Sequence, residues 1–272
     1  MNTVPILSIL FMAISALLAF VIPILLYFYF SRKKGADSAP FLVGCAVMFL
    51  FALVLESAIH NVVLLRTEAG KTIQDSIWLY ALYGGLMAGL FEETGRFLAF
   101  RTVLRKYNGK DVNALMYGAG HGGIEAVFLL GFTMISNIAL SVMINRGMTS
   151  SITASLSGDA LAQIEASLDA LRSSPPTTFL IGLLERVIAI ALQIALSVIV
   201  WFGAKHARSW YLFPAAILIH AVVDGVTAVF VKSQASNLLI YSVLAVLTLL
   251  TIGLAVLVWK KHVPKKPAAS EG

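Results

Sequence analysis

Long, nearly unbroken runs of apolar residues alternate with short polar stretches along this chain. A helix needs about 20 apolar residues to cross a bilayer. Seven runs reach that length and predict seven membrane-spanning helices, at residues 6–30, 40–65, 77–100, 112–143, 178–203, 210–231 and 237–259. We therefore expect an all-α fold in the form of a polytopic transmembrane helix bundle.

The lysines and arginines between these runs predict the orientation of the bundle. Outside the predicted helices, thirteen fall in one set of loops and five in the opposite set. Because cytoplasmic loops carry the excess of positive charge, we expect the N-terminus outside and the C-terminus in the cytoplasm. We interpret residues 1–261 as a single transmembrane helical domain. Its outer loop, about 145–177, contains an amphipathic helix, and residues 262–272 form a disordered cytoplasmic tail.

The composition agrees with a membrane protein. The 272 residues are 59% hydrophobic and 12% charged, whereas soluble domains carry about 25% charged residues. A single cysteine, Cys45, excludes a disulfide framework and a cysteine-based metal motif. The net charge of +6 does not indicate nucleic acid, because the basic residues gather where the predicted helices leave the membrane.

Three clusters of ionisable residues interrupt the apolar runs. A charged side chain near the bilayer centre is costly, so such residues usually face a protein interior and mark a function. At a rise of about 1.5 Å per residue, all three clusters fall at similar depths, slightly to the cytoplasmic side of the midplane. We therefore expect them to converge on one site. The clusters are Glu92, Glu93 and Arg96; His121 and Glu125; and His220 and Asp224.

These side chains are of the types that peptide hydrolysis requires. The reaction needs a water molecule, a base that deprotonates it and a group that stabilises the oxyanion. One of the adjacent carboxylates Glu92 and Glu93 can be the base, and their spacing does not decide which. His121 and His220 can bind zinc, with Glu125 as a third ligand, or can act on the oxyanion directly. The helical His-Glu-x-x-His zinc motif is absent, so the pattern leaves both versions open.

Two other functions would use the same side chains. Carboxylate and histidine chains relay protons in transporters, although an odd number of helices without internal repeats argues against a proton-coupled transporter. A catalytically inactive scaffold that binds membrane proteins would use the cluster as contacts between helices. Such contacts average below about 1 kcal/mol, which makes many of them a costly way to hold a bundle.

Two smaller polar groups lie elsewhere in the predicted helices. Gln193 and Ser197 are four residues apart at a depth similar to that of the main clusters, so they are candidates to line the site. Glu56 and His60, also four apart, lie towards the outer side and are interpreted as a packing or gating pair.

Three motifs, in the same order and on separate predicted helices, resemble those of the YhfC family of intramembrane metalloproteases. The resemblance extends more distantly to PrsW-type proteases and to the superfamily of CAAX proteases and bacteriocin-processing enzymes, and it spans most of the chain. The motifs are Glu92-Glu93-Thr-Gly-Arg96, Gly120-His121-Gly-Gly-Ile-Glu125-Ala and His220-x-x-x-Asp224.

The resemblance implies an intramembrane endopeptidase in a bacterial-type cytoplasmic membrane, with a membrane protein or a lipidated peptide as substrate. It implies a water-activating carboxylate in the paired-glutamate motif and later histidines that assist or bind a metal, with Arg96, Glu125 and Asp224 in support. The CAAX enzymes have Phe-x-x-x-His as their second motif, whereas this chain has His121-x-x-x-Glu125. The division of labour between His121 and Glu125 therefore stays open.

Overall fold

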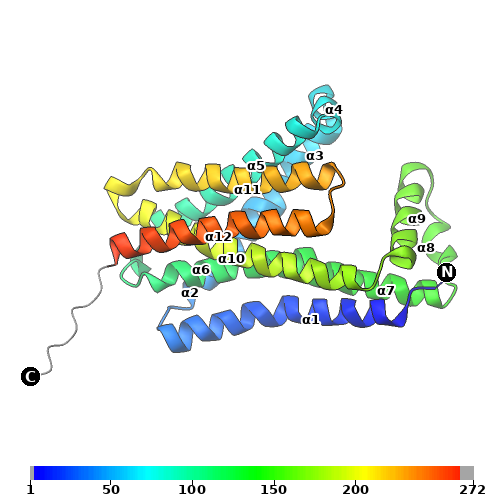
Figure 1. Ribbon diagram of the computed structural model, residues 1–272, viewed down its shortest axis with the longest axis horizontal. Helices are drawn as coiled ribbons and strands as arrows, with labels where there is room; N and C mark the ends of the chain where they lie inside the picture. Colours follow the sequence, from blue (N-terminus) through cyan, green and yellow to red (C-terminus); the bar gives the residue numbers. More distant parts are fainter. Residues whose placement is uncertain (1–2, 264–272) are drawn as a thin grey trace, which may run out of the picture. The chain divides into compact units, whose positions relative to one another are not determined.

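A computed structural model describes residues 3–263 of the chain as helices joined by short loops (Figure 1). The predicted all-α class is confirmed. The chain folds into two compact units: unit 1 contains residues up to 24 and residues 126–187, and unit 2 contains residues 25–125 and those from 188 onward. The predicted tail lies outside the described residues from 264, and its first residue, His262, ends a helix.

Three of the helices contribute residues to both units: α1, α10 and α6, whose last residue, Ala126, belongs to unit 1. The helices of unit 1 are α1 (Ile6–Phe28, up to 24), η4 (Val127–Phe132), α7 (Thr133–Asn145), α8 (Ser150–Thr153), α9 (Gly158–Ser173) and the start of α10 (Thr177–Lys205). Unit 2 holds the end of α1, η1 (Tyr29–Lys33), α2 (Ala39–Val47), η2 (Met48–Glu56), α3 (Ser57–Arg66), α4 (Glu68–Asp75), α5 (Ile77–Arg101), η3 (Arg105–Tyr107), α6 (Val112–Ala126), the rest of α10, η5 (Ala207–Ser209), α11 (Leu212–Lys232) and α12 (Asn237–His262).

Six helical stretches within the described residues are long and apolar enough to cross a membrane. They are Ile6–Lys33, Ala39–Arg66, Val112–Asn145, Thr177–Lys205, Ala207–Lys232 and Asn237–His262. The seventh predicted span, 77–100, is helix α5, whose glutamates and glycines lower its hydropathy. Its 25 residues still cover about 38 Å at 1.5 Å each, more than the ~30 Å core of a bilayer. The number of spans and their orientation stay predictions.

In unit 2, helices α5 and α11 lie side by side (Figure 1). Glycines on α5 make this close approach possible: a Cβ added at Gly89 would lie 2.6 Å from the carbonyl oxygen of Ile217, and one at Gly85 would meet the carbonyl of Ala221. Small residues let membrane helices pack backbone to backbone in this way. The contact sets Glu93 of α5 beside His220 of α11.

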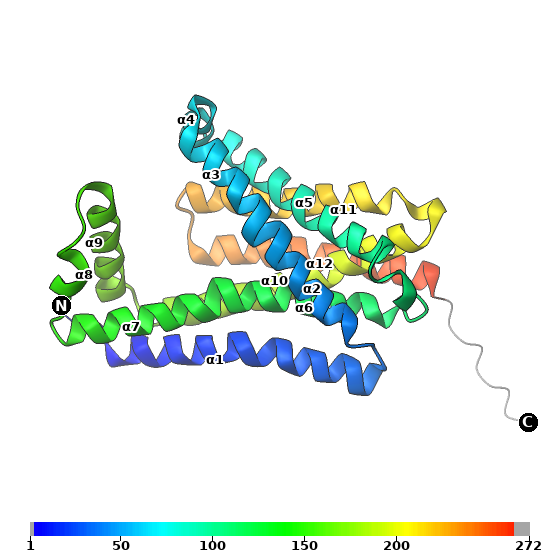
Figure 2. The ribbon, with the colours of Figure 1, turned by 180° about the vertical axis from the view of Figure 1, so that it is seen from behind.

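Glycines also bring α6 against its neighbours in unit 2. A Cβ at Gly118 would lie 2.5 Å from the Cα of Ile194 on α10, and one at Gly122 would lie 3.0 Å from the Cβ of Gln193. On another face of α6, Gly120 meets the backbone of Phe41 on α2. The segment that contains α2, η2 and α3 then runs along α5, which Figure 2 shows from behind.

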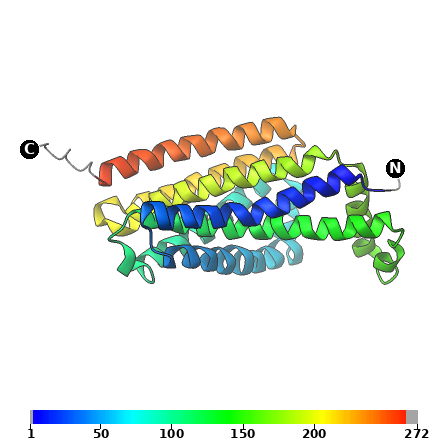
Figure 3. The same cartoon turned by 90° about the horizontal axis from the view of Figure 1, so that it is seen from below.

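Helix α10 supplies the largest share of the main apolar core of unit 2. Of its most apolar 18 residues 72% are buried, against 22–28% in the other five candidate spans, so α10 is the central helix. The Phe100 ring packs on Trp201 of α10 with centroids 5.0 Å apart, and on Tyr117 of α6 with centroids 4.6 Å apart. Helix α12 covers the later half of α10 (Figure 3), and its exposed leucines fit a lipid-facing surface.

Unit 1 packs α1 against α7 and the beginning of α10. Ser15 donates a hydrogen bond to the backbone oxygen of Phe179 at 2.8 Å, and Asn145 bonds both the amide and the carbonyl of Val4. Helix α9 buries Leu168 and Leu171 in the same apolar cluster. The ionisable residues of the three predicted clusters all lie in unit 2.

Candidate functional site

Helix α5 presents three ionisable side chains to the interior of unit 2. Glu92, Glu93 and Arg96 are all buried, and Glu93 and Arg96 have no exposed surface at all. Each side chain projects from the part of α5 that packs between α6, α10 and α11. A charge in such a place is stable only when it is paired and hydrogen-bonded, so the partners of the two glutamates decide what each can do.

Glu93 belongs to an ion pair. Arg96 Nη1 lies 2.6 and 2.5 Å from the two carboxylate oxygens of Glu93, one helical turn away. His220 of α11 adds a third contact, with Nδ1 2.7 Å from Glu93 Oε1. The Nε2 atom of the same imidazole lies 3.5 Å from Asp224, whose side chain is 41% exposed and marks the outer margin of the cluster. The Glu93 charge is therefore neutralised within the protein.

Glu92 has different partners. Its Oε2 atom lies 2.9 Å from His121 Nε2 on α6 and accepts a hydrogen bond of 2.8 Å from Gln193 Nε2 on α10. The same Gln193 amide donates to Glu125 at 3.2 Å, and its oxygen accepts from Arg96 Nη2. Gln193 thus joins both halves of the cluster, and Glu92 is held by an imidazole and an amide.

Three buried polar atoms beside these contacts have no hydrogen-bond partner among the described residues. They are His121 Nδ1, Arg96 Nε and the hydroxyl of Tyr117. Buried polar groups are almost always bonded, to the protein or to water. The orphaned atoms therefore mark places where a water molecule or a substrate group would be bound.

The structure thus brings six of the seven predicted residues into one buried cluster and places Asp224 at its edge. Gln193 lines the cluster, and Ser197 donates to the Gln193 backbone oxygen at 2.7 Å on the same helix. Sequence reasoning missed Tyr117. The sequence could have indicated Tyr117, because it lies four residues before His121 and so shares a helix face with it. In the structure the two ring centroids are 5.9 Å apart.

A second polar group lies near the cluster. His60 contacts Glu56 Oε1 through Nε2 and the Tyr83 hydroxyl through Nδ1, both at 3.0 Å. Glu56 is buried. The side chains of His60 and Asp224 are both partly exposed, at 30% and 41%.

The arrangement of the carboxylates and imidazoles tests the predicted zinc site. Glu92 Oε2 and His121 Nε2 are 2.9 Å apart, a separation that two ligands of one zinc ion could adopt. Within residues 3–263, however, no three His, Cys, Asp or Glu side chains are grouped as ligands of one ion. Glu125 bonds to Gln193, and His220 bonds to the carboxylate that Arg96 already neutralises. As arranged, these residues do not fit a zinc site with three protein ligands, so we derive no chemical step through a metal.

The fold and the buried cluster define a polytopic helical membrane protein with an acid–histidine centre. The chain belongs to the YhfC family: the model of the YhfC intramembrane metalloprotease family matches residues 18–247. The chain is also 36% identical over 218 residues to a protein of Bacillus subtilis (strain 168) described as the uncharacterized membrane protein YhfC. That match covers 80% of this chain and 83% of the relative. No solved structure matches the chain.

Proposed function

We propose that this chain is an intramembrane endopeptidase of the bacterial cytoplasmic membrane that cleaves membrane proteins or lipidated peptides. One observation carries the proposal: two adjacent buried glutamates have unlike partners. Arg96 neutralises Glu93, whereas Glu92 is held by an imidazole and an amide. Such an asymmetry separates a structural carboxylate from one that is available to exchange a proton.

In the proposed reaction, Glu92 is the general base. Its Oε2 atom accepts hydrogen bonds from the protein, and its Oε1 atom receives the water. Glu92 takes a proton from the water as the water oxygen bonds to the carbonyl carbon of the substrate. The carbon–nitrogen bond then breaks, and Glu92 returns the proton to the leaving amine, so the products are a carboxylic acid and an amine.

The oxyanion needs donors that are already in place. The Arg96 Nε–H and the Tyr117 hydroxyl are buried donors without partners among the described residues, and they fill this role. His121 and Gln193 orient the Glu92 carboxylate. Glu93 holds Arg96, and His220 in turn holds Glu93. Water enters the proposed site past Asp224, whose side chain is partly exposed at the edge of the cluster.

The test is cleavage of fluorescein-labelled casein and of a panel of labelled transmembrane and lipidated peptides by full-length protein in detergent. Removal of a general base costs about 10²–10⁴-fold in rate, so Glu92→Gln should lose at least that factor for every cleaved peptide. Glu68→Gln, the same chemical change at an exposed position of α4, should cleave like the wild type.

Equal cleavage by the Glu92→Gln and Glu68→Gln variants would remove Glu92 from the reaction. If wild type cleaves nothing in the panel, proteoliposomes with a pH-sensitive dye inside separate the two remaining functions. Proton flux that is lost in Glu92→Gln indicates a transporter, and no flux indicates a membrane scaffold.

A further inference from the structure

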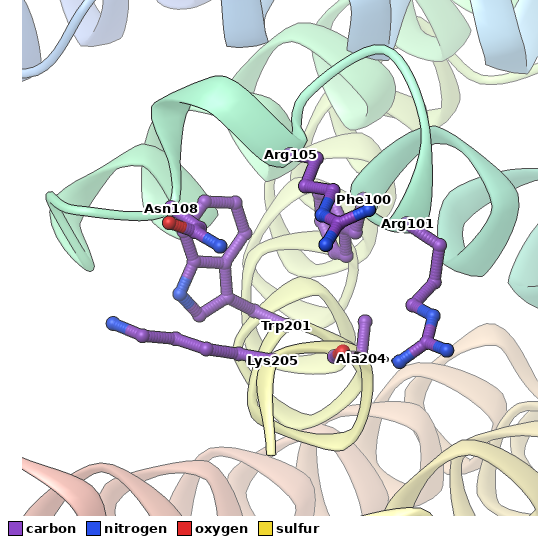
Figure 4. A pocket seen from close by; sticks show the side chains of 7 residues that line it. All are labelled: Phe100, Arg101, Arg105, Asn108, Trp201, Ala204 and Lys205. Carbon is purple, nitrogen blue, oxygen red and sulfur yellow. Dashed lines mark hydrogen bonds between the residues drawn. The ribbon is translucent and has the colours of Figure 1, made fainter. Parts of the chain in front are cut away.

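A cavity of about 290 Å³ lies where α5 and α10 end in unit 2 (Figure 4). It is separate from the acid–histidine cluster: Arg101, which lines it, follows Glu92 by nine residues on α5. Phe100 and Trp201 are its buried aromatic residues. Arg101, Arg105, Asn108 and Lys205 supply its polar lining.

The polar groups in this cavity are mostly hydrogen-bond donors. Arg101 Nη1 donates to the backbone oxygen of Ala204 at 3.1 Å, which fixes the guanidinium of α5 against the end of α10. In the view of Figure 4, the Arg105 guanidinium points into the space between Asn108 and Arg101. Arg105 forms no ion pair with the part of the chain that the structure describes.

The positive charge of the cavity is only partly balanced. Asp111 accepts hydrogen bonds from Lys205 Nζ at 2.6 Å and from Trp201 Nε1 at 2.9 Å, so it neutralises one of the three cations and holds the indole in place. The two arginines remain uncompensated. Guanidinium groups bind phosphate through paired, charge-assisted hydrogen bonds.

We propose that this cavity binds the phosphate group of an anionic phospholipid. Basic pockets between helix ends at the cytoplasmic surface are suited to such headgroups, and this cavity lies on the side that the charge distribution predicts to be cytoplasmic. Leu98 and Val103, in the same segment as the arginines, are exposed apolar side chains that an acyl chain can cover. A bound lipid would connect α5 and α10, the helices that carry Glu92 and Gln193.

The experiment is native mass spectrometry of the full-length protein in detergent with dioleoyl phosphatidylglycerol, dioleoyl phosphatidylcholine or inorganic phosphate. Loss of one charge-assisted hydrogen bond should weaken phosphatidylglycerol binding about tenfold in Arg105→Gln. Lys106→Gln is the matched control, because it removes the same charge from the next residue, whose ammonium lies over the Tyr107 ring. Arg105→Lys keeps the charge and should retain part of the affinity.

Tight, salt-sensitive binding of phosphatidylglycerol that depends on Arg105 and not on Lys106 supports the proposal. Inorganic phosphate that binds with the same Arg105 dependence and displaces the lipid would overturn the lipid assignment in favour of a soluble phosphate ligand. Equal binding of phosphatidylcholine, or equal losses in the Arg105 and Lys106 variants, would overturn the site. Because Arg105 is exposed, each variant should melt like the wild type, and a melting measurement on each checks that the fold is intact.

Discussion

Replacement of Glu93 by glutamine should destabilise the protein strongly, because it leaves the guanidinium of Arg96 buried without its counter-ion. Both members of this pair have no exposed side-chain surface, and their closest atoms are 2.5 Å apart. Removal of one partner from a buried ion pair costs about 3–5 kcal/mol. For a chain of this size, that corresponds to a fall in melting temperature of roughly 6–20 °C.

The assay is far-UV circular dichroism during heating of the purified protein in detergent. The matched control is Glu68→Gln, which breaks the Glu68–Lys71 pair at the same three-residue spacing, where the side chains are 88% and 70% exposed. Exposed pairs contribute about 0–1 kcal/mol, so this variant should melt within about 4 °C of the wild type.

A double variant separates the lost charge balance from lost packing. Glu93→Gln combined with Arg96→Met leaves no uncompensated charge, so it should recover most of the lost melting temperature. If Glu93→Gln melts like Glu68→Gln, then Arg96 is hydrated or finds another counter-ion. In that case the division between a structural Glu93 and a reactive Glu92 is refuted.

Three further predictions test the chemistry, the helix packing and the loop electrostatics. Cleavage should continue after exhaustive dialysis against a chelator, because the proposed base and oxyanion donors are protein groups; loss of activity that zinc restores would assign water activation to a metal. Gly89→Ala should lower the melting temperature by roughly 2–12 °C, since its Cβ would lie 2.6 Å from the Ile217 carbonyl oxygen. Gly84→Ala on the same helix meets nothing within 4 Å, and equal melting of the two variants would contradict the close α5–α11 contact. The Lys110 Nζ atom lies 2.7 Å from Asp37 Oδ1 and lowers the pKa of Asp37 below its ordinary value of 3.8. The ionised Asp37 therefore stabilises the fold at a pH above 3.8, and this stabilisation is lost as the pH falls through the lowered pKa. Wild type should melt at a higher temperature than Asp37→Asn at pH 6, and the two should converge towards pH 3.

The sequence predicts the helical class and the convergence of the polar clusters for a simple physical reason. Apolar runs of bilayer length have one stable conformation in a membrane, and a fixed rise per residue gives the depth of Glu92, His121 and His220. Helix α5 has a lower hydropathy than the other predicted spans, because charged residues that form the cluster lie on it.

The pairing of side chains between helices could not be predicted in the same way. The i,i+4 spacing of His220 and Asp224 is visible in the sequence, but the 2.7 Å contact of His220 is with Glu93 on another helix. Likewise, His121 meets Glu92, and Gln193 joins two carboxylates and a guanidinium. These partners depend on how each helix is rotated about its axis, which is set by glycine contacts such as that of Gly89.

The amide of Gln193 has a consequence for how the two glutamates can differ at all. An amide is polar in one direction: its nitrogen end faces Glu92 and Glu125, and its oxygen end faces Arg96. The amide therefore stands between the Arg96 guanidinium and the carboxylates of Glu92 and Glu125. An ionised glutamate at this position could still accept from Arg96 but could not donate to Glu92 and Glu125, so the two glutamates of α5 would lose the separate partners on which the proposed function rests.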